Sequence, residues 1–463
     1  MDIKKGDTVE LNVERVVYGG RGLAHLNRIV IFVDKAVPGD RVIARVVRIK
    51  KDFAEARVME VIEASPHRIV APCPYSSYCG GCSWQLIKYE KQLEYKHGFV
   101  QELLNHIGNV RDFKLHRVLP APQIFEYRNK MEFSFSDRRW LLPEERNERR
   151  DNNRFALGLH VPGTFDKIID IEGCLLQKEK GNEILREVKR YAKGSGIPVY
   201  GLRSHQGFWR YLMLRHSHCF DEWMVNIVTS DEKDQPVHAL ASLLKDQFRE
   251  VTSIANNINT RKGGTAVGEW ERILVGEGNI RDRIGGLTFE ISVNSFFQTN
   301  TPMAERLYES VRDFASLEGK ETVLDLYCGI GTVSIFLASQ ATRVIGVDIS
   351  KGALADANRN CELNGIDNCE FLCGDVRMVL SQVNVKPELL VTDPPRTGMH
   401  KKVVEGILRL LPERIVYISC NPATMARDIA LLKDWYRVEE VQPIDLFPNS
   451  YHVESIARLG RIS

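Results

Sequence analysis

The stretch Asp325-Leu-Tyr-Cys-Gly-Ile-Gly-Thr332 decides the fold of the C-terminal part of this chain. It continues a short apolar run that begins at Thr322 and leads directly into an apolar helical pattern. Gly329 and Gly331 allow the backbone to turn tightly and to approach a ligand without a Cβ collision. The third glycine of a dinucleotide fingerprint is absent, and Asp325 would repel a phosphate. The turn therefore argues against NAD and its pyrophosphate.

The sequence around this turn alternates short apolar runs with helical segments from about residue 291 onward. The apolar runs, typical of buried strands, begin at Thr322, Arg343, Glu370, Leu389 and Arg414. Buried strands that alternate with helices predict an α/β, Rossmann-like, doubly wound parallel sheet, with ligands at the carboxyl ends of its strands. We therefore assign residues 291–463 to one such domain.

Acidic residues follow the first four of these runs, at Asp325, Asp348, Asp375 and Asp393. The carboxyl ends of parallel strands meet at one edge of a sheet, so we expect these side chains to lie together. Asp348 is placed to accept hydrogen bonds from ribose hydroxyls. An acid-flanked loop with two glycines suits a nucleoside with a cationic tail, and S-adenosylmethionine is such a ligand. The alternative is that the glycines only allow a helix to pack against a strand.

A proline-rich turn and a thiol follow the next two runs. The turn is Asp393-Pro-Pro-Arg-Thr-Gly398, and the thiol belongs to Ser419-Cys-Asn-Pro422. Asp-Pro-Pro turns also occur in amino-group methyltransferases, where an aromatic residue usually follows in place of Arg396. Cys420 is expected at the same sheet edge as the acids, which favours a nucleophile over a structural cysteine.

A thiol at this place would serve the methylation of uracil. C5 of uracil is too weak a nucleophile to attack a methyl sulfonium, but addition of a thiolate at C6 gives C5 carbanion character. A base must then remove the C5 proton so that the thiol can leave. The segment Phe447-Pro-Asn-Ser-Tyr-His-Val-Glu454 offers both His452 and Glu454 as candidates, and we favour the carboxylate.

The N-terminal residues 1–65 predict a small β-barrel. Short alternating runs are separated by glycine-rich or Pro-Gly turns, a pattern that fits barrels of the oligonucleotide-binding kind. Residues 41–51 interleave five cations with β-branched residues, which indicates a strand with a basic face. The pattern resembles a TRAM domain, the barrel found on RNA-modifying enzymes. The alternative is a module that only adds stability.

The motifs together resemble those of the RNA uracil-C5 methyltransferase family, across nearly the whole chain. They are Asp393-Pro-Pro-Arg-x-Gly, Ser419-Cys-Asn-Pro and His452-Val-Glu, and the closest match is to the iron–sulfur branch that modifies 23S ribosomal RNA. The resemblance implies that Cys420 is the nucleophile and Glu454 the general base. It places Phe296 at the substrate and implies cofactor contacts from Gln298, Tyr327, Asp348, Asp375 and Asp393. Two positions depart from the family: Asp348 stands where Glu is common, and Thr332 where this branch often has Asn.

The middle region, residues 66–290, is expected to be mixed α and β, with helices over 89–104 and 178–191. It contains Cys73, Cys79 and Cys82, whose uneven spacing suits a cubane iron–sulfur cluster better than the paired spacing of zinc sites. We expect Cys174 as the fourth ligand, because it is turn-like, lies in the same region and agrees with the family pattern. A fourth thiol indicates a closed [4Fe-4S] cluster, unlike the open iron of radical S-adenosylmethionine enzymes.

Composition restricts the remaining classes of function. The net charge is only +2, apolar residues make up 43% of the chain, and no run approaches a membrane span. The N-terminus has no secretory signal, so we expect a cytoplasmic protein, and we expect a monomer. We predict an S-adenosylmethionine-dependent RNA uridine C5-methyltransferase that acts on 23S rRNA. The alternatives are a tRNA uridine methyltransferase, a radical methylthiolating enzyme and a non-catalytic RNA-binding protein.

Overall fold

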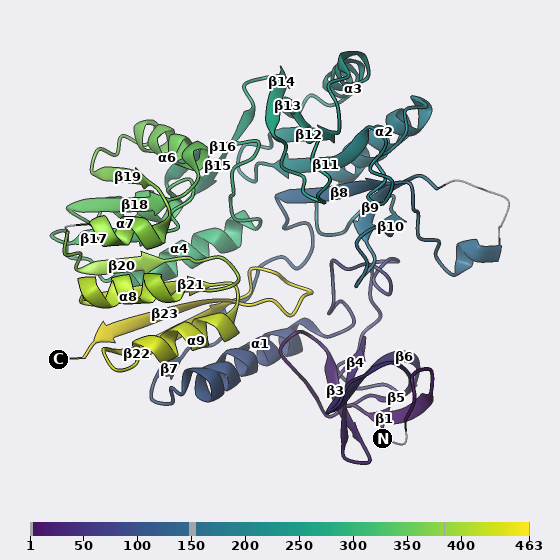
Figure 1. The fold of residues 1–463 in the computed structure, drawn as a ribbon, viewed down its shortest axis with the longest axis horizontal. Coiled ribbons are helices and arrows are strands. Elements are labelled where there is room, and N and C mark those ends of the chain that lie inside the picture. The colour runs from purple at the N-terminus through teal and green to yellow at the C-terminus, as the bar shows by residue number, and fades with distance from the viewer. Residues whose placement is uncertain (1–2, 148–153, 384, 463) are drawn as a thin grey trace.

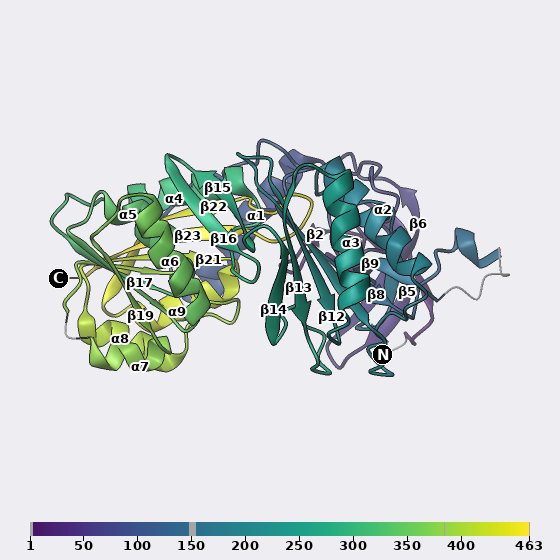
Figure 2. The same cartoon turned by 90° about the horizontal axis from the view of Figure 1, so that it is seen from above.

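The structure, a computed structural model, describes residues 3–147, 154–383 and 385–462. Figure 1 shows the N-terminal barrel at the lower right, a second sheet above it, and the C-terminal sheet on the left. Seen from above, in Figure 2, the C-terminal sheet and its helices occupy one end of an elongated molecule. No helix of the described ranges is long and apolar enough to cross a membrane.

The barrel is a six-stranded sheet in the order β1-β5-β6-β4-β3-β2. Its strands are β1 (Thr8–Asn12), β2 (Arg15–Val16), β3 (Gly22–Leu26), β4 (Ile29–Asp34), β5 (Arg41–Ile49) and β6 (Phe53–Glu63). The alternation predicted for residues 41–51 is present, since Val42, Ala44 and Val46 are buried while Arg45 and Arg48 are exposed. One face of β5 thus builds the barrel core and the other carries positive charge.

The second sheet has seven strands in the order β10-β9-β8-β11-β12-β13-β14. They are β8 (Lys130–Ser136), β9 (Ala156–His160), β10 (Ile168–Asp170), β11 (Trp209–His216), β12 (Trp223–Thr229), β13 (Val251–Ile258) and β14 (Trp270–Val275). A short 3-10 turn, η2 (Glu144–Asn147), precedes β9. Helices α2 (Glu179–Gly194) and α3 (Asp234–Gln247) bury apolar side chains in the same core as β11 and β12.

The C-terminal sheet has eight strands in the order β19-β18-β17-β20-β21-β23-β22-β7. They are β7 (Lys114–Leu115), β17 (Thr322–Leu326), β18 (Arg343–Asp348), β19 (Cys369–Cys373), β20 (Leu389–Thr392), β21 (Arg414–Ser419), β22 (Tyr436–Ile444) and β23 (Glu454–Arg461). β17 to β21 are parallel, as predicted, and β23 runs antiparallel to both β21 and β22. The fold is therefore a Rossmann-like α/β domain with an N-terminal barrel.

Helices cover both faces of this sheet. Their apolar side chains form one buried cluster with the strands on one face and a second cluster on the other face. The helices are α4 (Thr301–Ala315), α5 (Thr332–Ala338), α6 (Lys351–Leu363), α7 (Val376–Gln382), α8 (Lys401–Leu410) and α9 (Pro422–Leu432). A separate hairpin, β15 (Asn279–Ile284) and β16 (Leu287–Ser292), precedes α4. These elements bring the ends of β17 to β21 to one edge.

Helix α1 (Tyr89–Leu103), which η1 (Leu104–Gly108) continues, joins the barrel side of the molecule to the C-terminal sheet. Val100 and Leu104 lie in the apolar cluster beneath β21 and α9, and β7 pairs in parallel with β22. Figure 1 shows one end of α1 below α9 and the barrel beyond the opposite end of α1. Part of the segment 66–290 thus packs on the C-terminal sheet.

Candidate active site

The turn after β17 lies against the end of β18. The Gly329 N–H donates to Asp348 Oδ2 at 3.0 Å, and the Ser350 N–H donates to Asp348 Oδ1 at 2.8 Å. The two glycines differ in their surroundings: a Cβ on Gly331 would lie 3.1 Å from Ala357 and Phe371, whereas one on Gly329 would meet nothing within 4 Å. Helix packing thus requires Gly331, and Gly329 leaves open space in front of the turn.

Three acids lie close together behind this turn. Burial raises the pKa of Asp325 to about 7, and the Asp393 carboxylate adds to the shift, while the Ser334 hydroxyl donates to Asp325 at 2.6 Å. Burial likewise raises the pKa of Asp393 to about 7, and burial together with Asp393 raises that of Glu454. Mutual repulsion of buried carboxylates is relieved by a cation. The chemistry of these residues therefore fits a sulfonium ligand.

Two further positions expected at the cofactor, Tyr327 and Asp375, also lie at this edge. Tyr327 follows β17 in the left-handed backbone region, with φ of 66°. Asp375 caps α7 by accepting from the Arg377 N–H at 2.9 Å. The Arg377 guanidinium hydrogen-bonds the same carboxylate and holds its pKa at about 2. Asp375 is therefore charged and already has one cationic partner.

Strand pairing brings Cys420 and Glu454 together. β21 and β23 are antiparallel with Ser419 opposite Ser455, so Cys420 and Glu454 come one residue beyond that pair. Burial raises the pKa of the Cys420 thiol to about 11; Glu454 adds to this shift and Arg396 opposes it. Glu454 is buried at 3% exposure. The carboxyl group of Glu454 therefore lies close enough to the thiol for its charge to affect the pKa of Cys420.

His452 lies on the loop that leads to Glu454 and packs on Tyr451, with ring centroids 4.2 Å apart. Burial, reinforced by the positive charge of Arg396, lowers the pKa of His452 to about 4. The imidazole is therefore neutral near pH 7 and a weak base. This distinguishes it from Glu454, whose raised pKa makes its carboxylate a stronger proton acceptor.

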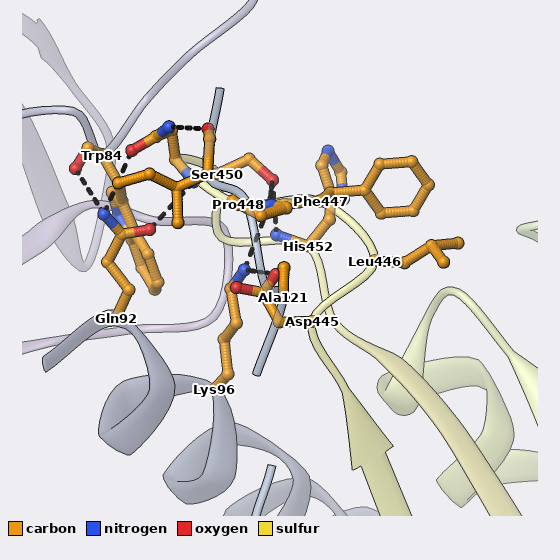
Figure 3. A network of polar contacts seen from close by, with 12 residues as sticks. Trp84, Gln92, Lys96, Ala121, Asp445, Leu446, Phe447, Pro448, Ser450 and His452 are labelled. Carbon is orange, nitrogen blue, oxygen red and sulfur yellow. Dashed lines mark hydrogen bonds and ion pairs between the residues drawn. The ribbon is translucent and has the colours of Figure 1, made fainter. Parts of the chain in front are cut away.

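Helix α1 holds the loop between β22 and β23 (Figure 3). Lys96 is fully buried and donates to Asp445 Oδ1 at 2.5 Å and to the Phe447 carbonyl at 3.1 Å. Gln92 accepts from the Asn449 N–H at 2.9 Å. Figure 3 shows Gln92 and Lys96 reaching from the helix to this loop. The segment that ends at Glu454 is thereby fixed at several points.

The segment 295–300 lies beside that loop, because Asn300 Nδ2 donates to the Leu446 carbonyl at 3.0 Å. Phe296 is 64% exposed, Phe297 belongs to the apolar core, and Gln298 is buried. The Gln298 carbonyl accepts from Asn129 Nδ2 at 2.7 Å, which ties the segment to the second sheet. An exposed aromatic ring next to a buried one fits the substrate position expected for Phe296.

The four cysteines of the middle region line one cavity of about 140 Å³: Cys73, Cys79, Cys82 and Cys174. Burial raises the pKa of Cys82 to about 11 and that of Cys174 to about 12. Within the described parts of the chain, no three His, Cys, Asp or Glu side chains are arranged to hold a single metal ion. The structure therefore brings the predicted thiols together without the geometry of a one-ion site.

Some residues of the site have no local sequence pattern that could have revealed them. Tyr308 of α4 donates its hydroxyl to Thr332 at 3.2 Å. Lys96 lies 349 residues from Asp445. The Tyr18 hydroxyl, from the barrel, donates to Asn421 beside Cys420 at 2.9 Å, across 403 residues. Only the folded chain shows such pairs.

The fold and the site define a class I methyltransferase with an added barrel. The tRNA (uracil-5-)-methyltransferase family model matches residues 221–462, and the TRAM domain model matches residues 3–59. The chain therefore belongs to the tRNA (uracil-5-)-methyltransferase family. The resemblance to the RNA uracil-C5 methyltransferase family inferred from the sequence motifs, the TRAM barrel included, is confirmed.

Relatives of known sequence or structure agree with this assignment. The chain is 40% identical to an uncharacterized RNA methyltransferase of Chlorobaculum tepidum, over 99% of this chain and 97% of the relative. It is 39% identical to an uncharacterized RNA methyltransferase of Bacteroides thetaiotaomicron, over 95% and 98% of the two chains. The crystal structure of Pyrococcus abyssi tRNA (uracil-54, C5)-methyltransferase in complex with S-adenosyl-L-homocysteine is 30% identical, with a TM-score of 0.75, and covers 97% of this chain and 100% of its own.

These comparisons confirm the predicted class of enzyme, an RNA uracil-C5 methyltransferase, and RNA as its partner. S-adenosylmethionine is the cofactor that this family membership supports.

Proposed function

We propose that this protein transfers a methyl group from S-adenosylmethionine to C5 of one uridine in 23S rRNA, with Cys420 as nucleophile and Glu454 as general base. The observation that carries the proposal is the register of β21 and β23, which sets the thiol next to a buried carboxyl group. Asp393 and Arg396 act electrostatically on the same pair. A structural cysteine would not require this arrangement.

The residues of the site divide the chemistry between them. S-adenosylmethionine, when bound, supplies an electrophilic methyl group on a sulfonium. Cys420 gives its proton to solvent, its Sγ bonds to C6 of uracil, and the electron pair of the C5–C6 π bond moves onto C5, which can then accept that methyl group. Glu454 then takes the C5 proton, and the electron pair of that C–H bond expels the thiolate from C6. His452 is the weaker candidate for this base because of its lowered pKa.

The cofactor contacts belong to the same proposal. Asp348 would accept hydrogen bonds from ribose hydroxyls. Each of its carboxylate oxygens accepts one hydrogen bond from a backbone N–H and can accept another. Tyr327, Asp375 and Asp393 would line the rest of the pocket, with Gln298 from the segment before α4. Phe296 would stack on the target base after the base has left the RNA helix. This contact would replace the base stacking, worth a few kcal/mol, that is lost on extrusion.

Transfer RNA is the second candidate substrate. The Pyrococcus abyssi structure, a tRNA uracil-54 methyltransferase, favours it. The resemblance to the iron–sulfur branch favours 23S rRNA, and for that reason we retain ribosomal RNA as the first candidate. Incubation with tritiated cofactor and each RNA, followed by identification of the methylated nucleoside, separates the two. We further propose that the protein acts in the cytoplasm as a monomer.

We also propose that Cys73, Cys79, Cys82 and Cys174 hold one [4Fe-4S] cluster, with a structural or RNA-positioning role. Support comes from the cavity that all four line. In a cubane each thiolate binds a different iron. The four sulfurs around a cubane lie farther apart than four sulfurs around one ion, so thiols that line one cavity without forming a one-ion site among the described residues are compatible with a cluster.

The nucleophile is tested with RNA that carries 5-fluorouridine at the target position. Fluorine leaves no removable C5 proton, so the wild-type protein should form an adduct with RNA that resists denaturation. Cys420→Ala should form none. The matched control is Cys361→Ala, which removes the thiol of a buried cysteine on α6. An adduct that persists in Cys420→Ala would show that the nucleophile is another residue.

A further inference from the structure

The barrel reaches into the catalytic centre through the loop between β2 and β3. Tyr18 Oη donates to Asn421 Oδ1 at 2.9 Å. The Tyr18 ring packs edge-on against Phe99 of α1 and Tyr451, with centroids 5.8 and 6.1 Å away. The hydroxyl is close enough to Cys420 and Glu454 for their negative charges to raise its pKa, in addition to the effect of burial.

The loop between β2 and β3 is held in place by a hydrogen bond and by close packing. Trp84 Nε1 donates to the Gly20 carbonyl at 3.0 Å. Gly20 has φ of +84°, and a Cβ there would lie 2.8 Å from the Tyr451 ring, so the close approach requires glycine. Val16, Trp84 and Phe99 form one buried cluster under the loop. The orientation of Tyr18 is therefore set by its packing.

Asn421, the partner of Tyr18, organises the turn that carries the nucleophile. Its Oδ1 also accepts from the Ala423 N–H at 3.2 Å and so caps α9, while its Nδ2 donates to the Arg396 carbonyl at 3.0 Å. One amide thus connects the residue after Cys420, the start of α9 and the Arg396 turn. The barrel supplies the remaining hydrogen bond to this amide through Tyr18.

We propose that Tyr18 is a positioning residue of the methyl-transfer reaction, by which the N-terminal barrel holds Asn421 and thus the Cys420 turn in its reactive geometry. The inference rests on the proposed roles of Cys420 and Glu454. It gives the barrel a part in catalysis in addition to RNA binding. Loss of the single hydroxyl should then slow the attack of Cys420 while leaving RNA affinity unchanged.

Tyr18→Phe tests this inference, because it keeps the ring in its cluster and removes only the hydroxyl. One neutral hydrogen bond corresponds to a loss of about three- to tenfold in rate. We expect that loss in the single-turnover rate of adduct formation with 5-fluorouridine RNA, at unchanged RNA dissociation constant and unchanged melting temperature. The matched control is Tyr95→Phe, in which the tyrosine packs on Trp84 in the same cluster, with centroids 6.0 Å apart.

A double-mutant cycle separates positioning from a general packing effect. Serine still caps a helix but is too short to meet Tyr18 and Arg396 as asparagine does. Tyr18→Phe should therefore have little effect in the Asn421→Ser background. An adduct rate equal to wild type in Tyr18→Phe, or an equal loss in both backgrounds, would overturn the positioning role. Failure of the wild-type protein to form any adduct would instead overturn the proposed function.

Discussion

We expect Asp445→Asn to destabilise the C-terminal unit strongly, because it leaves the buried ammonium group of Lys96 without its carboxylate. The two side chains are fully buried, with Nζ and Oδ1 2.5 Å apart. Burial lowers the pKa of Lys96, and Asp445 opposes that shift. Removing one partner of a buried ion pair costs about 3–5 kcal/mol. For a unit of this size that corresponds to a melting temperature lower by about 6–20 °C.

Thermal unfolding followed by circular dichroism at several pH values measures the effect. Without Asp445, burial lowers the pKa of Lys96 further, so the folded variant binds fewer protons than the unfolded chain. Its stability should then rise with pH up to about 10.4, the ordinary pKa of lysine. Lys96→Met combined with Asp445→Leu is the matched control, since an apolar pair should restore much of the loss. A melting temperature within about 2 °C of wild type for Asp445→Asn would refute the reasoning.

Five further predictions concern the site, the cysteine cluster and the barrel. Glu454→Gln should permit thiol addition and methyl transfer but trap methylated RNA on the enzyme, and near-normal turnover would assign the base to His452 or water. Because the pKa of Cys420 is raised to about 11, adduct formation should rise about tenfold per pH unit between pH 6 and 9; a flat profile would show that RNA binding lowers this pKa. Anaerobically purified protein should contain about four irons and four sulfides per chain, and stoichiometric zinc would contradict the cluster. Phe296→Ala should lower the methylation rate at unchanged S-adenosylmethionine affinity. Deletion of residues 1–65 should weaken RNA binding, also at unchanged S-adenosylmethionine affinity. If the truncated protein bound RNA as tightly as the full chain, the barrel would be only a structural module.

The parallel half of the C-terminal sheet was predictable, because a local sequence pattern marks each of its strands. Each of the five apolar runs is short and bounded by turn residues, and the rule that parallel strands end at one edge places Asp348, Asp375, Asp393 and Cys420 together. The structure has strands at all five runs. The alternation of residues 41–49 likewise identified the basic face of β5 from period alone.

The antiparallel half of the sheet was not predictable in the same way. The sequence indicates neither that β23 pairs with β21 nor the register that sets Glu454 beside Cys420, since one sequence carries no pair information. For the same reason α1 was recognisable as a helix over residues 89–104, but not as the element that anchors the loop before Glu454. Its contacts with Asp445 and Asn449 join residues more than 300 positions apart.

The charges of the site explain why its parts would act in sequence. In the free protein burial raises the pKa values of Asp325 and Asp393 to about 7 and that of Cys420 to about 11, and neighbouring carboxylates add to the shifts of Asp325 and Cys420. A sulfonium bound among these groups would lower each pKa, because an opposite charge favours the ionised form. The carboxyl groups would then ionise and Glu454 would become competent as a base, while the positive charge of the sulfonium would offset the raising effect of Glu454 and Asp393 on the pKa of the Cys420 thiol. Binding of the cationic methyl donor would thus prepare Glu454 as the base before the C5 proton has to be removed.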